Sequence, residues 1–311
     1  MSTATTDSAR TREPPERTRL TLSEWLAAFK RAGKQFLEDD CTGLSQQVAF
    51  GALLAFLPTV ILLIGLLGLL GSGVFDSLEH FVGSVAPQGV VSVIDTAKND
   101  AAHNKSGSAI AFAVGAVAAL WAASGAMGAV VKAVNRAYGR RETRPFWKVR
   151  LISLVLVFAT GIVLAGTFLL IVFGGDLGNA IARRTPLGGE FKLFWNIARW
   201  PIAFTAVLLF FSLVYYLAPN VEQRSRKWVS AGSVVGSLMW LALSGLFALY
   251  TSFSSSYDRT YGSLAGAIIL LLWLNYSAWA ILFGAELNAE LDRRLGRTGH
   301  GEAAVQGSVR V

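Results

Sequence analysis

The sequence predicts an all-α polytopic membrane protein: a bundle of six transmembrane helices, preceded by an amphipathic helix on the cytoplasmic side. The 311-residue chain is 53% hydrophobic and only 15% charged, whereas soluble proteins are about a quarter charged. Six apolar windows contain no Asp, Glu, Lys, Arg or His. Each has about the 20 residues that a helix needs to cross the hydrocarbon core of a bilayer. Windows this long and continuous are not the alternating strands of a membrane barrel.

The first element is expected to be a polar tail over residues 1–20, which we predict to be disordered. It has no apolar stretch that would resemble a cleavable signal peptide. Thr21 and Glu24 have the spacing of a capping box, which predicts a helix through about Asp39 within an amphipathic segment, 21–47. Its apolar side chains would share one face: Trp25, Phe29, Ala32 and Phe36. This helix would lie on the cytoplasmic membrane surface or, alternatively, dock under the bundle.

The transmembrane domain is predicted over residues 48–296 and is followed by a polar tail, 297–311, that we expect to be disordered. Its six spans are 48–70, 109–131, 151–173, 200–218, 229–250 and 264–284. Pro201 would stand at the start of the fourth span, where the missing N–H costs nothing. The loop over 73–107 is the longest external segment. It is either functional or simply a cap on the outer face.

Lys and Arg residues are shared unevenly between the segments that join the spans. Residues 132–150, after the second span, are the richest, and the other segments on the same side add to the excess. Because cytoplasmic segments carry this excess, both termini are predicted to be cytoplasmic. The same bias explains the net charge of +8, so no nucleic-acid partner is predicted.

The segment that follows the second span contains the most prominent basic pattern. Lys132, Arg136 and Arg140 are four residues apart and would form one stripe on a helix that continues past the membrane. Near an anionic leaflet, each such residue gains on the order of 1 kcal/mol. Anchoring to anionic lipid is the simpler interpretation. The alternative is a basic gate for an anionic substrate, to which Arg144 would also belong.

Small residues recur at the spacing of helix contacts, as in Gly232-Ser-Val-Val-Gly236 and in the series Ala111, Gly115 and Ala119. Tight packing is the default interpretation. For Ser124 and Gly125, the alternative is that their small side chains leave room for a ligand.

Polar residues are rare in the last span and follow it closely. Asn275 needs a partner, which is either a neighbouring helix or a transport path. Glu290 and Arg294 have the spacing of an ion pair at a solvated helix end. Glu286 lies just past the span edge, where it could face an inner vestibule, pair with Arg136 or a neighbour, and couple a proton or substrate.

Enzyme chemistry has little support in this sequence, which lacks HExxH, P-loop and nucleophile-elbow patterns. The three histidines are scattered, and the single cysteine allows no intrachain disulfide. We therefore predict no catalytic residues, no metal site and no cofactor.

Two regions resemble the signatures of a known family. "LWAASGAMGAVVKAVNRAYGRRETRPFWKVR" and "YGSLAGAIILLLWLNYSAWAILFGAELNAELDRR" are similar to segments of the YihY/BrkB family, and the resemblance spans about residues 25–295. It implies a bacterial inner-membrane protein with about six spans and a role in transport, of lipids or envelope components. The family has carried a "virulence factor" label and a "ribonuclease BN" label, the latter regarded as a misassignment. This chain departs from the family in having "QQVAFGALLAF" where relatives have a Tyr-rich "ALAYY" stretch.

The leading functional hypothesis is a transporter or exporter of an amphiphilic or anionic envelope compound. Arginines would attract the substrate, and small or polar residues would line or couple its path; the candidates are Ser124, Gly125, Asn135, Arg136, Arg140, Arg144, Asn275 and Glu286. The alternative is a membrane scaffold or envelope-integrity factor that binds anionic lipid or a protein partner. No residues support a ribonuclease. The substrate, the coupling ion and the oligomeric state stay open.

Overall fold

The computed structural model describes residues 20–70, 105–172, 175, 188–221, 228–253 and 265–295. Both predicted tails, the 73–104 part of the long loop and the 254–264 connection lie outside these ranges. The all-α prediction is confirmed, because every regular element within the described ranges is a helix. Six of these helices are long and apolar enough to cross a membrane.

The helices coincide with the predicted elements but extend beyond most of the charge-free windows. They are α1 (Leu22–Glu38), α2 (Cys41–Leu70), α5 (Lys105–Ala137), α6 (Phe146–Val172), α8 (Gly188–Leu217), α9 (Ala231–Phe253) and α11 (Ala265–Arg294). Because α8 begins at Gly188, Pro201 lies inside this helix. The prediction that Pro201 stands at the start of the helix is therefore wrong. Similarly, α2 begins at Cys41, so the amphipathic segment is shorter than 21–47. Charged residues in the added turns of α5, α6, α8 and α11 hide these extensions from a search for charge-free windows, whereas the added residues 41–47 of α2 are polar but uncharged.

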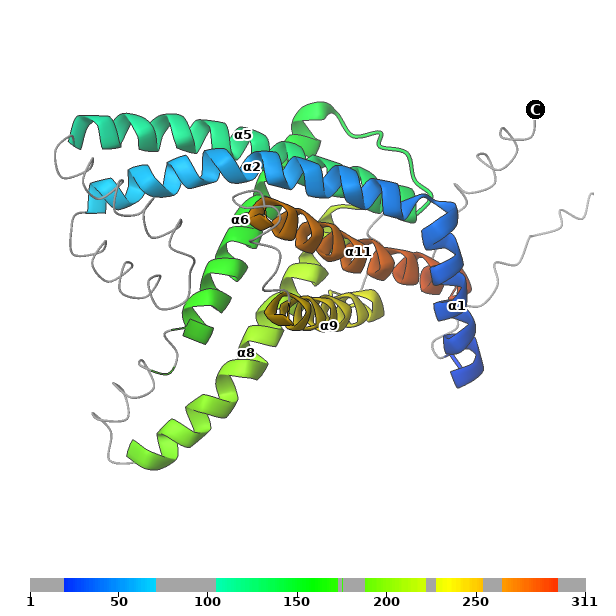
Figure 1. The fold of residues 1–311 in the computed structure, drawn as a ribbon. Coiled ribbons are helices and arrows are strands. Elements are labelled where there is room, and N and C mark those ends of the chain that lie inside the picture. Colours follow the sequence, from blue (N-terminus) through cyan, green and yellow to red (C-terminus); the bar gives the residue numbers. More distant parts are fainter. Residues whose placement is uncertain are drawn as a thin grey trace, which may run out of the picture.

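Helix α11 occupies a central position and contacts α1, α2, α5 and α9. Helices α2 and α5 run side by side, whereas α6 and α8 diverge from this pair (Figure 1). The close approach of α2 and α5 depends on small residues. A Cβ atom on Gly115 would lie 2.6 Å from the backbone nitrogen of Leu62. The predicted packing role of Gly115 is therefore confirmed.

Helix α1 crosses the end of α11 (Figure 1). Its capping box is formed, with Thr21 and Glu24 bonded reciprocally. Ala28 and Ala32 are fully buried against Leu287 and Leu291 of α11. Farther along α1, the ring of Phe36 lies 6.1 Å from that of Trp279. Of the two interpretations of this helix, the structure therefore supports docking against the bundle, which buries the predicted apolar face.

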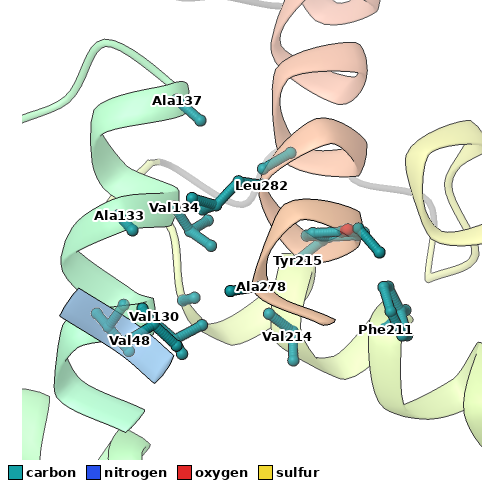
Figure 2. Packing of buried hydrophobic residues seen from close by; sticks show 14 of the residues in the cluster. Val48, Val130, Ala133, Val134, Ala137, Phe211, Val214, Tyr215, Ala278 and Leu282 are labelled. Atoms are coloured by element: carbon teal, nitrogen blue, oxygen red, sulfur yellow. The ribbon is translucent and has the colours of Figure 1, made fainter. Parts of the chain in front are cut away.

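A hydrophobic core joins α5, α8 and α11 at the end of the bundle that α1 covers, which we call the α1 end. Val130 and Val134 of α5 face Val214 of α8 and Leu282 of α11 (Figure 2). The ends of α5, α8 and α11 meet here with the starts of α2 and α9, as contacts between these segments show. The polar clusters described next are held by this core.

Candidate functional site

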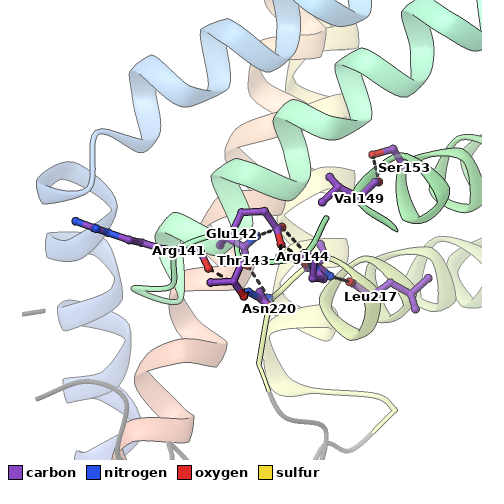
Figure 3. Close-up of polar contacts among 10 residues, drawn as sticks. Arg141, Glu142, Thr143, Arg144, Val149, Ser153, Leu217 and Asn220 are labelled. Carbon is purple, nitrogen blue, oxygen red and sulfur yellow. Dashed lines mark hydrogen bonds and ion pairs between the residues drawn. The ribbon is translucent and has the colours of Figure 1, made fainter. Parts of the chain in front are cut away.

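A polar network joins the 138–145 loop to the end of α8 (Figure 3). At its centre, Arg144 donates from Nε and Nη2 to both carboxylate oxygens of Glu142, over 2.7 and 2.6 Å. The same guanidinium donates to the carbonyl oxygens of Leu217 and Ala218, over 3.1 and 2.7 Å. These carbonyls are at the C-terminus of α8, where no later turn can satisfy them. Arg144 therefore acts as a cap for α8.

Asn135 ties this network to α5. Its Nδ2 donates to Glu142 over 2.8 Å, and its Oδ1 accepts from the backbone N–H of Asn220 over 2.6 Å. Asn135 is 2% exposed, and its two partners lie 7 and 85 residues away in the sequence. Hydrogen bonds from Arg144 hold the pKa of the Glu142 carboxyl below its ordinary value, against the opposing effect of burial. Asn135 and Arg144, both predicted as site residues, thus meet in a saturated structural network.

The end of α5 corrects the prediction of a basic stripe of three residues. Gly139 has φ +62°, and its N–H donates to Arg136, while the N–H of Arg140 donates to Asn135. This pattern is a Schellman motif, which ends a helix at a residue in the left-handed region. Arg140 lies beyond the helix end at Ala137, so it does not continue the stripe of Lys132 and Arg136.

A second polar cluster surrounds Glu286 on α11, where α1 meets α2. Glu286 is 0% exposed, and its Oε1 accepts from the thiol of Cys41 over 3.5 Å. Asp39 lies close enough to act electrostatically on Cys41 and Glu286. Asp39 in turn forms an ion pair with Arg136, with Nε–Oδ1 at 3.4 Å. The predicted pairing of Glu286 with Arg136 is therefore indirect, through Asp39.

Three polar atoms on one face of α11 have no hydrogen-bond partner among the described residues. They are Oδ1 of Asn275, Nε1 of Trp279 and Oε2 of Glu286, all buried. The spacing i, i+4, i+11 places these side chains within about 40° of one another around the helix. Asn275 and Glu286 are about 16 Å apart along the axis at 1.5 Å per residue. We call these three residues the unpaired stripe. Among the neighbouring helices that the structure describes, the Oδ1 of Asn275 finds no partner, so a transport path stays the prediction for this residue.

Glu290, one turn beyond Glu286, differs in having several partners. Its oxygens lie 2.6 Å from Nε of Arg294, 3.6 Å from Nε of Arg293 and 3.6 Å from Nε of Arg31 on α1. The predicted ion pair with Arg294 is confirmed, but the helix end is not solvated, because Glu290 is 4% exposed. Helix α1 covers it and supplies the third arginine.

Ser124 and Gly125 lie apart from these clusters. The Ser124 hydroxyl donates to the carbonyls of Leu120 and Trp121 in its own helix, over 2.5 and 3.0 Å. Beside Gly125, a Cβ atom would meet only the Arg150 guanidinium, at 3.9 Å. Room is therefore present at Gly125, and a cation reaches into it.

Sequence analysis missed several members of these clusters. Glu142, Asn220 and Asp39 lie in connections between helices, where polar residues are ordinary, and the partners of Asn220 and Asp39 are distant in sequence. Cys41 was considered only for disulfides. A local signal existed for Glu142, because it lies two residues before the arginine that it binds. Among the described residues, no group of three or more His, Cys, Asp and Glu side chains is placed to hold a metal ion.

The lengths of the helices and their apolar surfaces place this protein in the class of multi-pass α-helical membrane proteins. The virulence factor BrkB family matches residues 32–307, so the chain belongs to that family.

Relatives agree with this assignment. The chain is 33% identical over 250 residues to the ribonuclease-like protein YfkH of Bacillus subtilis, which covers 80% of this chain and 90% of the relative. It is 26% identical over 260 residues to a UPF0761 membrane protein of Alteromonas mediterranea, covering 83% and 85%. A UPF0761 membrane protein of Mannheimia succiniciproducens is 34% identical over 131 residues, covering 42% and 41%. No solved structure matches the chain.

Proposed function

We propose that this protein moves an amphiphilic, anionic envelope compound across the bacterial inner membrane, with its termini in the cytoplasm. The observation that carries the proposal is the unpaired stripe of Asn275, Trp279 and Glu286 on α11. A buried polar group without a partner costs about 1–3 kcal/mol, and native proteins keep few of them. Three on one face of a membrane helix favour a surface that meets water or substrate polar groups in part of the working cycle.

The neighbourhood of Glu286 supports an entrance at the α1 end. Arg136 has a 62% exposed side chain and pairs with Asp39, which adjoins Glu286. Lys132 is also exposed one turn earlier on α5. An anionic headgroup would meet these cations first and the carboxylate cluster next. Glu286 would then act as the group that couples a proton or the substrate to movement.

Flux of fluorescent phosphatidylglycerol in proteoliposomes tests the proposal. We expect the wild type to exceed empty liposomes, and Asn275→Ala and Glu286→Gln to lower the flux about tenfold, the effect of losing roughly one hydrogen bond. Ser277→Ala is the matched control. Ser277 lies on the same helix, but its hydroxyl is paired with Trp240 Nε1 at 3.0 Å. Its loss is expected to leave the flux unchanged.

The possible outcomes distinguish an error in the proposed activity from an error in the proposed site. Equal flux in all variants would keep transport and remove the unpaired stripe from it. Flux no higher than in empty liposomes would remove phospholipid transport. That result would favour the second candidate function, a scaffold that binds anionic lipid through exposed cations of the α1 end. The observation favouring this alternative is the exposure of Arg31, Lys34 and Arg136, whose side chains are 64%, 74% and 62% exposed.

A further inference from the structure

Arg150, near the start of α6, reaches across to the middle of α5. Its Nη2 donates to the carbonyl oxygen of Trp121 over 3.0 Å, and its Cζ lies 4.3 Å from the centre of the Trp121 ring. Both are typical of a guanidinium held against an aromatic face. Nη1 points to the open space beside Gly125. The side chain is thus fixed in position by α5, with most of its donors still available.

The charge of Arg150 is not neutralised within the described part of the chain. No carboxylate there forms an ion pair with it, and the contacts with Trp121 use one of the five N–H donors of a guanidinium. Two arginines of the α1 end differ in this respect. Arg144 pairs with Glu142, and Arg294 pairs with Glu290. Arg150 therefore has the geometry of a cation waiting for an anion.

The surroundings of Arg150 face outward from two membrane-spanning helices. Trp121 is 70% exposed and Trp147 is 67% exposed. Trp147 and Arg150 lie within the four residues before the predicted span 151–173, and tryptophan is typical of the membrane interface. A charged side chain that borders lipid is costly unless it is paired. In this position the anion within reach is the headgroup of a lipid.

We propose that Arg150, held in place by Trp121, binds the phosphate of an anionic phospholipid on the lipid-facing surface of α5 and α6. The guanidinium donates to the phosphate oxygens, and Gly125 leaves the room for them. A planar fork of donors suits a phosphate better than an ammonium does. The acyl chains lie on exposed apolar side chains of the same helices, such as Val117 and Leu151. This site shares no residue with the unpaired stripe, and it does not depend on transport.

Native mass spectrometry of the detergent-purified full chain, titrated with phosphatidylglycerol, tests this site. We expect Arg150→Gln to weaken binding about tenfold, as loss of a charged hydrogen bond does. Lys192→Gln on α8 is the control for the loss of one exposed positive charge outside the site, and we expect a change below about twofold. The wild type is expected to bind phosphatidylglycerol more tightly than phosphatidylcholine. In phosphatidylcholine, the positive choline group of the same headgroup already neutralises the phosphate.

Four results would overturn the proposal. Unchanged binding by Arg150→Gln removes the residue, and an equal loss in Lys192→Gln shows attraction by net charge alone. Equal affinity for the two lipids shows apolar binding only. If Arg150→Gln does not fold, Arg150→Lys replaces it as the test variant. Lysine keeps the positive charge but lacks the planar fork of guanidinium donors, so Arg150→Lys should bind phosphatidylglycerol several-fold more weakly than the wild type. A wild-type dimer that Arg150→Gln converts to a monomer would assign this surface to a second copy of the chain.

Discussion

Replacing Arg144 with alanine should destabilise the bundle more than replacing any neighbouring basic residue. The change removes two charged hydrogen bonds to Glu142 and two to the last carbonyls of α8. It leaves Glu142 without its cation while both side chains are mostly buried, at 11% and 19% exposed. Breaking a buried ion pair from one side costs about 3–5 kcal/mol. Because this pair keeps some solvent contact, we expect about 3 kcal/mol.

The chain carries its own reporter for this experiment. Cys41 is the only cysteine and is 0% exposed, so a thiol-reactive dye should label it only as the protein unfolds. A loss of about 3 kcal/mol corresponds to a decrease in Tm of roughly 5–10 °C for a chain of this order of size. Arg144→Lys keeps the charge but not the fork, and should fall between the wild type and Arg144→Ala.

Arg141 provides the matched control, because its side chain points away from the network (Figure 3). Only its backbone carbonyl takes part, accepting from Asn220 over 3.1 Å. Arg141→Ala should therefore change Tm by about 1 °C or less, as exposed substitutions usually do. If Arg144→Ala and Arg141→Ala give the same Tm, Arg144 is not a cap for α8, and the structural role assigned to it is wrong.

Two further predictions use the same assay. The pKa of Glu142 is lower in the folded protein than its ordinary value of 4.5, so its contribution to stability is present above that value and is lost as the pH falls through the folded pKa. Between pH 6 and pH 4, Tm should therefore fall less in Glu142→Gln than in the wild type, and parallel curves would contradict this. Gly232→Ala should lower Tm by several degrees, because a Cβ atom would overlap the Gly284 carbonyl of α11. Gly245→Ala on the same helix α9 meets nothing within 4 Å and should keep or raise Tm, so equal losses in the two variants would refute close packing at Gly232.

The transmembrane helices were predictable because length and apolarity are local properties of the sequence. All six spans were found in this way, and the capping box located the start of α1. Helix ends were harder to predict. Because the N-terminal part of α8 contains Glu190 and Lys192, it did not belong to the predicted charge-free span. Pro201 was therefore predicted at the start of the helix, whereas it lies inside it. The end of α5 depends on the positive φ of Gly139. The regular spacing of the basic residues instead predicted that the helix continued past this glycine.

The pairing of polar residues was not predictable, because it depends on which helix ends meet. Asn135 and Asn220 are 85 residues apart, and Cys41 and Glu286 are 245 apart. A single sequence carries no signal for such distances. Chemistry identified Asn135, Arg144 and Glu286 as unusual, but only their neighbours distinguish a saturated network from an unpaired one. Arg150 was counted only as one basic residue among many, since nothing local indicates that Trp121 holds it.

The two polar systems of the α1 end differ in whether all their carboxylate oxygens have hydrogen-bond partners. In the Arg144 network, both carboxylate oxygens of Glu142 and the amide of Asn135 are engaged, which makes the 138–145 loop a rigid connection. On α11, Glu290 is equally well paired, yet Glu286, one turn away and fully buried, keeps one oxygen free. Two arginines of α11 and Arg31 of α1 satisfy Glu290, so cations are available at this end of the bundle. Under the proposed function, Oε2 of Glu286 meets a partner that comes and goes, and this is why the transport experiment compares Glu286 with a paired residue of the same helix.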